Sequence, residues 1–165
     1  MSGTDIAKNE LLQAVIAQVE AKLQELKAGY GAARDAVLST PHVMKSKREV
    51  FGQESAYLAN ALALNIQERE HELRTLRGMR LAENPKRVAL GCLVGVGDAD
   101  DAVEEWYLVL PVCGGMEVVR PGGEMPVRVV TPGTPVAKAL LGKSVGDEVA
   151  LPTNPPRVVV VRLVA

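Results

Sequence analysis

The sequence predicts an α+β protein in which an N-terminal antiparallel coiled-coil hairpin is followed by a small antiparallel β-sheet domain with one short helix. Three observations support this fold class. Apolar residues recur at helical spacing in the first half, they form short Val- and Leu-rich runs in the second half, and the period changes at Asn84-Pro85. Helices and strands repeat their faces every 3.6 and 2.0 residues, respectively. We therefore expect a hairpin domain over residues 1–84 and a sheet domain over residues 85–165.

The first predicted helix covers residues 5–38. Its apolar positions alternate between spacings of four and three residues, which is typical of a coiled-coil seam. These positions are Leu12, Ile16, Val19, Leu23, Leu26, Tyr30, Ala33 and Val37. Pro41 ends the pattern, because proline has no amide proton and restricts the residue before it. Gly29 and Gly31 each cost about 1 kcal/mol relative to alanine, so we expect the far part of this helix to be pliable.

A second predicted helix follows the break and stops at Asn84-Pro85. Its apolar positions are Phe51, Leu58, Leu62, Ile66, Leu73 and Leu76. Two helices of similar length joined by a short break form an antiparallel hairpin. At ~1.5 Å per residue, such a hairpin is about 50 Å long. Because each helix can bury only one narrow stripe, we expect a reaching element or an oligomerisation arm.

Beyond Lys86 the sequence predicts strands. Short runs rich in Val and Leu, which favour strands, are separated by Gly, Pro and Asp. The predicted strands are residues 87–96, 106–112, 116–119, 127–130 and 157–164. One helix interrupts them, since Thr134 is a suitable N-cap and Pro135 fits the first helical position. Gly142 is placed to end this helix in a left-handed conformation.

Composition and charge narrow the functional classes. The net charge of −1 argues against a basic surface that binds nucleic acid by counterion release. No apolar run approaches the roughly 18 residues of a membrane span, and the start of the chain has no signal pattern. We expect a cytoplasmic protein without a membrane contact. Cys92 and Cys113 have no metal-ligand spacing, so we expect two buried, reduced thiols and neither a metal nor a cofactor.

One stretch of the C-terminal half resembles a known family. Residues 134–143 read Thr-Pro-Val-Ala-Lys-Ala-Leu-Leu-Gly-Lys, and residues 145–149 read Val-Gly-Asp-Glu-Val. This is similar to the C-terminal signature of the bacterial Gre-type transcription elongation factors, GreA and GreB. That signature has Ser-Pro, a short apolar-basic helix, Gly-Lys and an acidic turn into a strand. The resemblance covers the whole chain, because these factors carry a helical hairpin followed by an FKBP-like domain, and residues 86–96 resemble that domain's first strand.

The resemblance implies a polymerase-binding protein that is not itself an enzyme. Gre factors dock their C-terminal domain near the rim of the secondary channel of RNA polymerase, and their hairpin enters the channel. Carried over to this chain, the docking loop contains Thr131, Thr134 and Pro135, with Lys138 and Lys143 nearby. These residues can also simply cap and end a helix, and the two roles are compatible. We expect a monomer.

The hairpin tip departs from the family pattern. In GreA it reads roughly Asp-Leu-Lys-Glu-Asn-Ala-Glu-Tyr, and its acidic residues help to hold magnesium and water for cleavage of backtracked RNA. The tip here comprises His42, Val43, Met44, Lys45, Ser46, Lys47 and Arg48, with Val43 and Ser46 in place of the first two acids. Magnesium prefers carboxylate oxygens, and a basic tip repels it. We therefore expect a regulator of elongation or pausing that does not promote cleavage efficiently.

Several alternatives stay open. If the alignment is shifted, Asp35, Glu49 or Glu54 could supply the tip acids of an active cleavage factor. The basic tip residues either form a solvated loop or contact RNA phosphates or an acidic surface of the polymerase. A dimerisation module would pair two chains through the seam from Leu12 to Leu26. An FKBP-like prolyl isomerase needs an aromatic pocket, whereas Trp106 and Tyr107 are adjacent in one predicted strand and so point to opposite faces.

Overall fold

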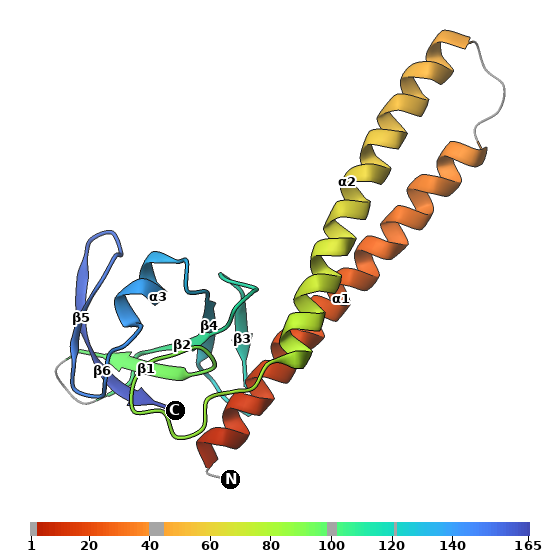
Figure 1. Cartoon of the computed structure of the whole chain (residues 1–165). Helices are drawn as coiled ribbons and strands as arrows, with labels where there is room; N and C mark the ends of the chain where they lie inside the picture. Colours follow the sequence, from red (N-terminus) through yellow and green to blue (C-terminus); the bar gives the residue numbers. More distant parts are fainter. Residues whose placement is uncertain (1–2, 40–44, 99–101, 121) are drawn as a thin grey trace. The chain divides into compact units, whose positions relative to one another are not determined.

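The computed structural model describes residues 3–39, 45–98, 102–120 and 122–165, without the side chains of residues 3–6, 37, 39 and 45–51. A helical hairpin precedes a six-stranded sheet with one short helix, so the predicted fold class is confirmed (Figure 1). The elements are α1 (Gly3–Ser39), α2 (Lys45–Gly78), β1 (Leu93–Gly97), β2 (Glu105–Val109), β3 (Glu117–Val119), β4 (Pro126–Val130), α3 (Pro135–Leu140), β5 (Glu148–Leu151) and β6 (Arg157–Val164). No helix of the described residues is long and apolar enough to cross a membrane.

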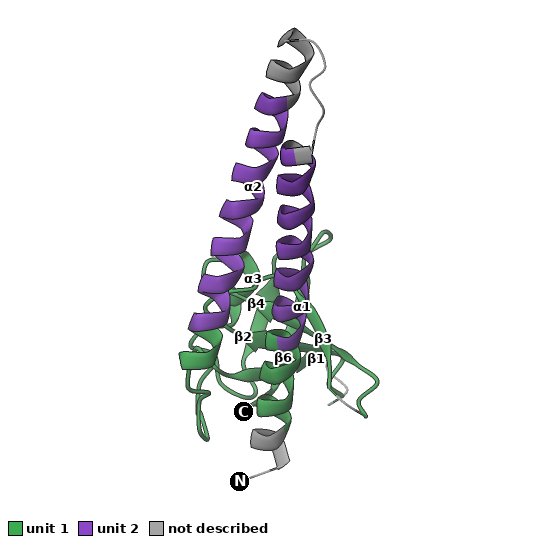
Figure 2. Ribbon diagram, turned by 90° about the vertical axis from the view of Figure 1, so that its right-hand side faces the viewer, with its two compact units in different colours: residues 1–16, 75–165 green, residues 17–74 purple. Residues whose placement is uncertain are grey.

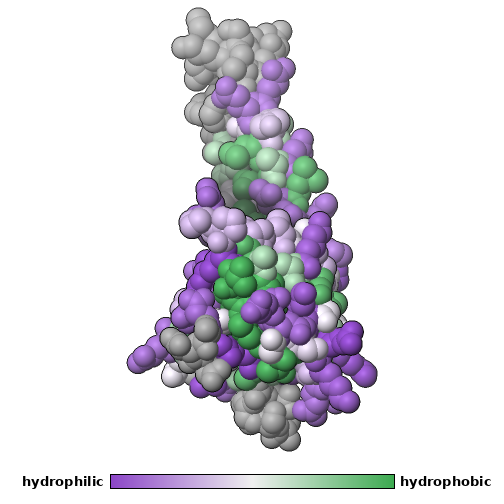
Figure 3. All heavy atoms as spheres, turned by 90° about the vertical axis from the view of Figure 1, so that its left-hand side faces the viewer, coloured by the Kyte–Doolittle hydropathy of each residue, from purple (hydrophilic) through white to green (hydrophobic). Residues whose placement is uncertain are grey.

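The chain divides into two compact units (Figure 2). The sheet unit comprises Met1–Ile16 and Thr75–Ala165, and the hairpin unit comprises Ala17–Arg74. The boundary expected after residue 84 follows the change of sequence period, whereas the compact units divide both long helices. The start of α1 and the last residues of α2 are therefore part of the sheet unit. Both units expose hydrophobic residues that are bordered by hydrophilic ones (Figure 3).

The hairpin unit buries apolar side chains at one end only. Val19, Leu23 and Leu73 are buried there, and Lys27 Nζ forms an ion pair with Glu70 Oε1 at 3.0 Å. Beyond this pair, towards the turn between the helices, none of the described side chains is buried. Leu58 is 51% exposed, so the prediction that it packs in the seam is wrong. Helical spacing identifies residues that share a face, but it does not show that a neighbour covers that face.

The six strands form one sheet in the order β3-β4-β2-β1-β6-β5. Four of its neighbouring pairs are antiparallel, but β2 and β4 are parallel. The sheet is therefore mostly antiparallel, as predicted, with one parallel pair that was not predicted. The cause is the placement of the β3–β4 hairpin, whose second strand lies next to β2. The chain reverses direction between β2 and β3 and again between β3 and β4, and two reversals restore the direction, so this pair is parallel.

The segment before β1 is irregular, although a strand was expected from Arg87. Its backbone groups bond outside a strand ladder: Val88 N donates to Lys143 O at 2.8 Å, and Gly91 N donates to Val109 O at 2.8 Å. Gly91 has a φ of +82°, which interrupts an extended backbone. β1 therefore begins at Leu93, and the expected start at residue 87 is wrong.

The two faces of the sheet differ in what covers them. Tyr107 lies on the face that packs against Ala137 and Leu140 of α3, together with valines from β1, β2, β4, β5 and β6. Trp106 lies on the opposite face and lines a cavity with residues of α1. The prediction that these two aromatic side chains point to opposite faces is therefore confirmed. Cys92 and Cys113 are buried free thiols, as expected.

Candidate functional site

The turn before α3 is fixed by two threonines. Thr134 N and Thr134 Oγ1 donate to Thr131 O at 2.9 and 2.8 Å, respectively. The same hydroxyl oxygen accepts a hydrogen bond from Ala137 N at 3.4 Å, and Pro135 occupies the first position of the helix. Thr134 is thus the predicted N-cap, whose hydroxyl satisfies an amide that has no partner within the helix.

The end of α3 is tied to the segment before β1. Leu141 N donates to Ala137 O at 2.8 Å, and Gly142 follows with a φ of +79°. This left-handed conformation confirms the predicted helix end, because only glycine adopts it without a steric cost. Gly142 N then donates to Val88 O at 2.8 Å. Val88 N also donates to Lys143 O, so two hydrogen bonds hold the C-terminal end of α3 against the segment before β1.

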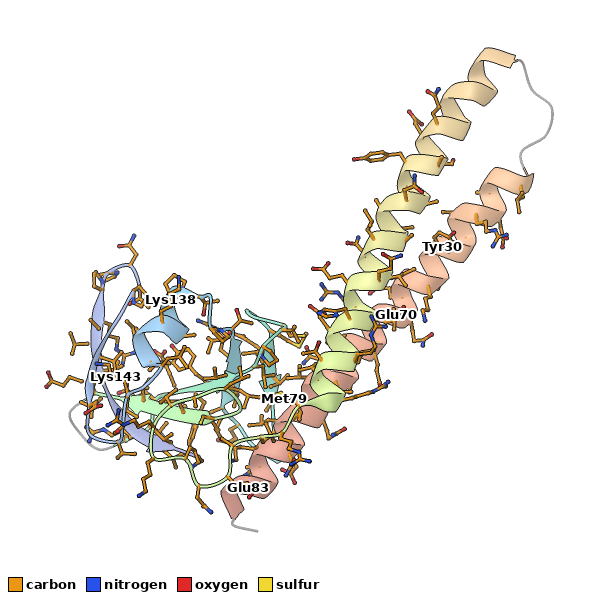
Figure 4. The ribbon with its side chains drawn as sticks, in the orientation of Figure 1. Tyr30, Glu70, Met79, Glu83, Lys138 and Lys143 are labelled. Atoms are coloured by element: carbon orange, nitrogen blue, oxygen red, sulfur yellow. The ribbon has the colours of Figure 1, made fainter. Side chains whose placement is uncertain are left out.

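The five residues expected to dock a partner all lie around this helix, and we call them the α3 surface: Thr131, Thr134, Pro135, Lys138 and Lys143. Pro135 and Lys138 are exposed, whereas the other three are half-buried. Ala137 and Leu140 anchor the opposite side of the helix in the core. Figure 4 shows Lys138 and Lys143 on this part of the sheet unit. The α3 surface therefore presents a proline and two ammonium groups, which suits a partner surface that offers carboxylates.

Little of the predicted hairpin tip can be placed. His42, Val43 and Met44 lie outside the described residues. The first turns of α2 contain Lys45, Ser46, Lys47, Arg48 and Glu49. The alternative in which Lys45, Lys47 and Arg48 form a solvated loop is therefore wrong. Their side chains are also outside the described part. Lysine and arginine are good helix formers, and the helix therefore starts before its first apolar position.

The acids considered as substitutes in the tip lie on helical surfaces. Asp35 is exposed on α1, and Glu54 is exposed on α2. Within the part of the chain that the structure describes, no group of three or more His, Cys, Asp or Glu side chains is placed to hold a metal ion. The roles expected for the tip and for the α3 surface stay predictions.

Sequence reasoning missed a buried lysine. Lys8 is 1% exposed, and its ammonium group donates to Ala82 O. It lines a polar cavity of about 590 Å³ with Met79 and Glu83, which Figure 4 labels. One signal was available, because Lys8 lies four residues before Leu12 and so continues the seam of the first helix.

A second missed feature is a charged cluster at the start of β6. Arg157 forms ion pairs with Asp98, Glu104 and Glu105, the last at 2.6 Å. Tyr107 donates its hydroxyl proton to Glu105 Oε2 at 2.5 Å. Burial, and then this bond to a carboxylate, raise the pKa of Tyr107 above its ordinary value. The sequence shows that acidic residues are frequent over positions 98–105, but the arginine that pairs with them is more than fifty residues away along the chain.

Comparisons with known proteins give only a distant likeness. No protein-family model matches the chain, and no curated protein matches it. Among solved structures, the chain is similar to the crystal structure of GreA factor homolog 1 (Gfh1) of Thermus thermophilus, with 22% identity over 91% of this chain and 94% of that one, and a TM-score of 0.36. A second structure, of the transcription factor Gfh1, shares 24% identity over 96% and 93% of the two chains, with a TM-score of 0.38.

Proposed function

We propose that this chain is a Gre-like regulator that binds bacterial RNA polymerase through the α3 surface. The observation that carries the proposal is the geometry of α3. The helix is capped by Thr134, ended by Gly142 and hydrogen-bonded to the segment before β1. Pro135 and Lys138 of the signature-like stretch are exposed on this fixed helix. A preorganised surface loses little conformational entropy on binding, which favours a docking role.

The hairpin unit fits a reaching role in this proposal. Residues 55–67 of α2 contain no charged side chain, and Tyr57 and Leu64 are 79% and 67% exposed. Large apolar residues in contact with water are typical of surfaces that bind another macromolecule. We propose that the hairpin enters the secondary channel of the polymerase, where its basic tip contacts RNA or an acidic protein surface.

In this proposal the bound factor alters elongation or pausing without efficient cleavage of the transcript. The support is the composition of the tip, in which Val43 and Ser46 replace acids of the GreA pattern. Valine cannot ligate a hard cation, and a serine hydroxyl adds no negative charge. Glu49 alone matches an acidic position of that pattern, and one carboxylate among three cationic side chains binds magnesium poorly.

Binding to purified core polymerase tests the docking step. We expect the wild-type protein to co-purify with the core enzyme, and Lys138→Glu with Lys143→Glu to weaken binding at least about tenfold through like-charge repulsion. Lys86→Glu is a matched control, because Lys86 is an exposed lysine of the same unit. Equal binding by the double variant and the control, with unchanged circular dichroism, would contradict the proposed docking surface.

A cleavage assay on a stalled, backtracked elongation complex tests the tip. We expect little cleavage with the wild-type protein and a gain of cleavage with the double variant Val43→Asp and Ser46→Glu. Robust cleavage by the wild-type protein would show that other acids, such as Asp35 or Glu54, supply the site. The assay separates docking from catalysis, because both proteins carry the same α3 surface.

The competing functions have less support. A dimer through the seam from Leu12 to Leu26 needs that seam to be available, but Leu12, Ile16, Val19 and Leu23 are already buried within one chain. Sedimentation of an extended dimer would favour this function again. An isomerase pocket needs aromatic residues on one face, whereas Trp106 and Tyr107 lie on opposite faces of the sheet.

A further inference from the structure

The sheet face opposite α3 has an apolar cavity that no function described above uses. Its floor is a row across four strands, in which Leu163, Gly95, Trp106 and Val127 lie side by side in register. Ala7 and Leu11 of α1 line the opposite side. The volume is about 390 Å³. All of these residues belong to the sheet unit.

Gly95 leaves room for the side chains of Val103 and Trp106. A Cβ at Gly95 would lie 2.9 Å from Cγ1 of Val103 and 3.1 Å from Cζ3 of Trp106, so the indole lies close to the glycine backbone. Trp106 is half-buried and lines the cavity. The aromatic ring is therefore available to a molecule that enters the cavity.

The cavity is open to solvent on one side, where the exposed Met125 lines it. Ligand sites are clefts or cavities that typically span about 300–1,000 Å³. The volume and lining therefore match a small ligand with an apolar body.

One wall of the cavity carries charge. Arg120 and the exposed Glu124 line it, and the guanidinium of Arg120 lies 3.9 Å from the carboxylate of Glu10. The side chains of Arg120 and Glu10 are nearly half exposed, at 48% and 43%. An exposed ion pair at this distance is weak, so a ligand anion can compete for the guanidinium. Met125, 43% exposed, also lines the cavity and offers an adaptable thioether.

We propose that this cavity binds a small aromatic or aliphatic anion, with its apolar body against Trp106 and its carboxylate or sulfonate at Arg120. The ligand lies between the start of α1 and the sheet. The site is separate from the α3 surface, which lies on the other side of the sheet, so the proposal stands whether or not the chain binds a polymerase.

The fluorescence of Trp106 measures binding to the cavity, because Trp106 is the one tryptophan of the chain. Two probes are titrated into the full-length protein: the anion 1-anilinonaphthalene-8-sulfonate and the uncharged N-phenyl-1-naphthylamine. We expect both to quench Trp106 emission by energy transfer, saturably and with one site per chain. If neither probe quenches Trp106 saturably, the proposal is wrong.

Variants then assign the site. Ala7→Phe fills the cavity and should weaken both probes at least about tenfold, since the space is removed, whereas Ala17→Phe, at an exposed position of the same helix, should weaken neither. Leu163→Phe carries the same expectation and replaces Ala7→Phe if circular dichroism shows that Ala7→Phe does not fold. Binding that is unchanged in the folded filling variant would overturn the location.

The charge of the ligand has its own test. Arg120→Gln should weaken the anionic probe about two- to fivefold, which is the effect of losing a half-exposed ion pair, and leave the uncharged probe unchanged. Arg128→Gln is the matched control, because Arg128 is an exposed arginine on the same β3–β4 hairpin that pairs with Glu117 instead. Equal loss of both probes with Arg120→Gln, or no loss of either, would contradict a site for anions.

Discussion

The sheet unit and the hairpin unit contain similar apolar residues but bury them differently. In the sheet unit, Val94, Val109 and Leu140 are completely buried between the sheet and α3. In the hairpin unit, Tyr57 and Leu64 remain largely exposed. Burial of apolar area is the main stabilising term in folding. Most of the stability therefore comes from the sheet unit, whereas the far part of the hairpin leaves large apolar side chains exposed to water.

Truncation of one leucine in each unit tests this division with the largest effect. Leu140→Ala removes a side chain with 0% exposure and should lower the free energy of unfolding by about 2–5 kcal/mol. Leu64→Ala removes an exposed side chain of the same size and should change it by less than about 0.5 kcal/mol. Urea denaturation measures both. Comparable losses in the two variants would mean that the far hairpin is packed after all.

The buried phenol of Tyr107 gives a smaller effect that depends on pH. Tyr107→Phe removes the hydrogen bond to Glu105 and should cost about 1.5 kcal/mol near neutral pH. Because folding raises the pKa of Tyr107, its contribution is fully present below about pH 10 and is lost as the pH rises further. Urea midpoints of both proteins at neutral and alkaline pH measure this. A constant difference between them at all pH values would contradict the assignment.

The cap of α3 has a still smaller effect. Thr134→Ala leaves an amide of the first helical turn without its partner and should cost about 1 kcal/mol. Thr153→Ala is the control, because the hydroxyl of this exposed threonine bonds only to Pro155 O in its own turn. Hydrogen exchange of residues 135–141 should accelerate in the first variant and not in the second. If exchange is unchanged in Thr134→Ala, the cap does not hold α3.

The smallest expected effect is a gain of stability, and it concerns the hairpin unit. A Cβ at Gly29 or Gly31 meets no atom within 4 Å, so each Gly→Ala change should stabilise α1 by up to about 1 kcal/mol. Gly142→Ala is a useful contrast, because the φ of +79° at that position should make alanine destabilising. Hydrogen exchange over residues 24–38 should slow in the two hairpin variants. Unchanged exchange would mean that this part of α1 is already stable.

Local chemistry explains which features could be predicted from the sequence. The two long helices, the cap at Thr134 and the helix end at Gly142 depend on neighbouring residues, and all were predicted. The parallel β2–β4 pair was not, because it depends on where a whole hairpin docks. The irregular segment before β1 depends likewise on bonds to Lys143 and Val109, far along the chain.

The candidate site shows the same limit. The resemblance to the Gre factors selected the five residues of the α3 surface, which lie together because they belong to one capped helix and its flanking turns. Sequence reasoning missed the burial of Lys8 and the arginine at the centre of the acidic cluster, since both depend on partners distant in sequence. It also placed Leu58 in the apolar stripe of the second helix, which is not covered at that position.

Hydrogen exchange of the full chain, free and bound to core RNA polymerase, tests the central claim most directly. It reports on α3 and on the hairpin in one experiment. We expect slower exchange on binding over residues 131–143, which contain the α3 surface, and over residues 52–66 of α2, where Tyr57 and Leu64 are exposed. Exchange over residues 131–143 that is identical in the free and bound states would contradict the claim that this chain docks on the polymerase through α3.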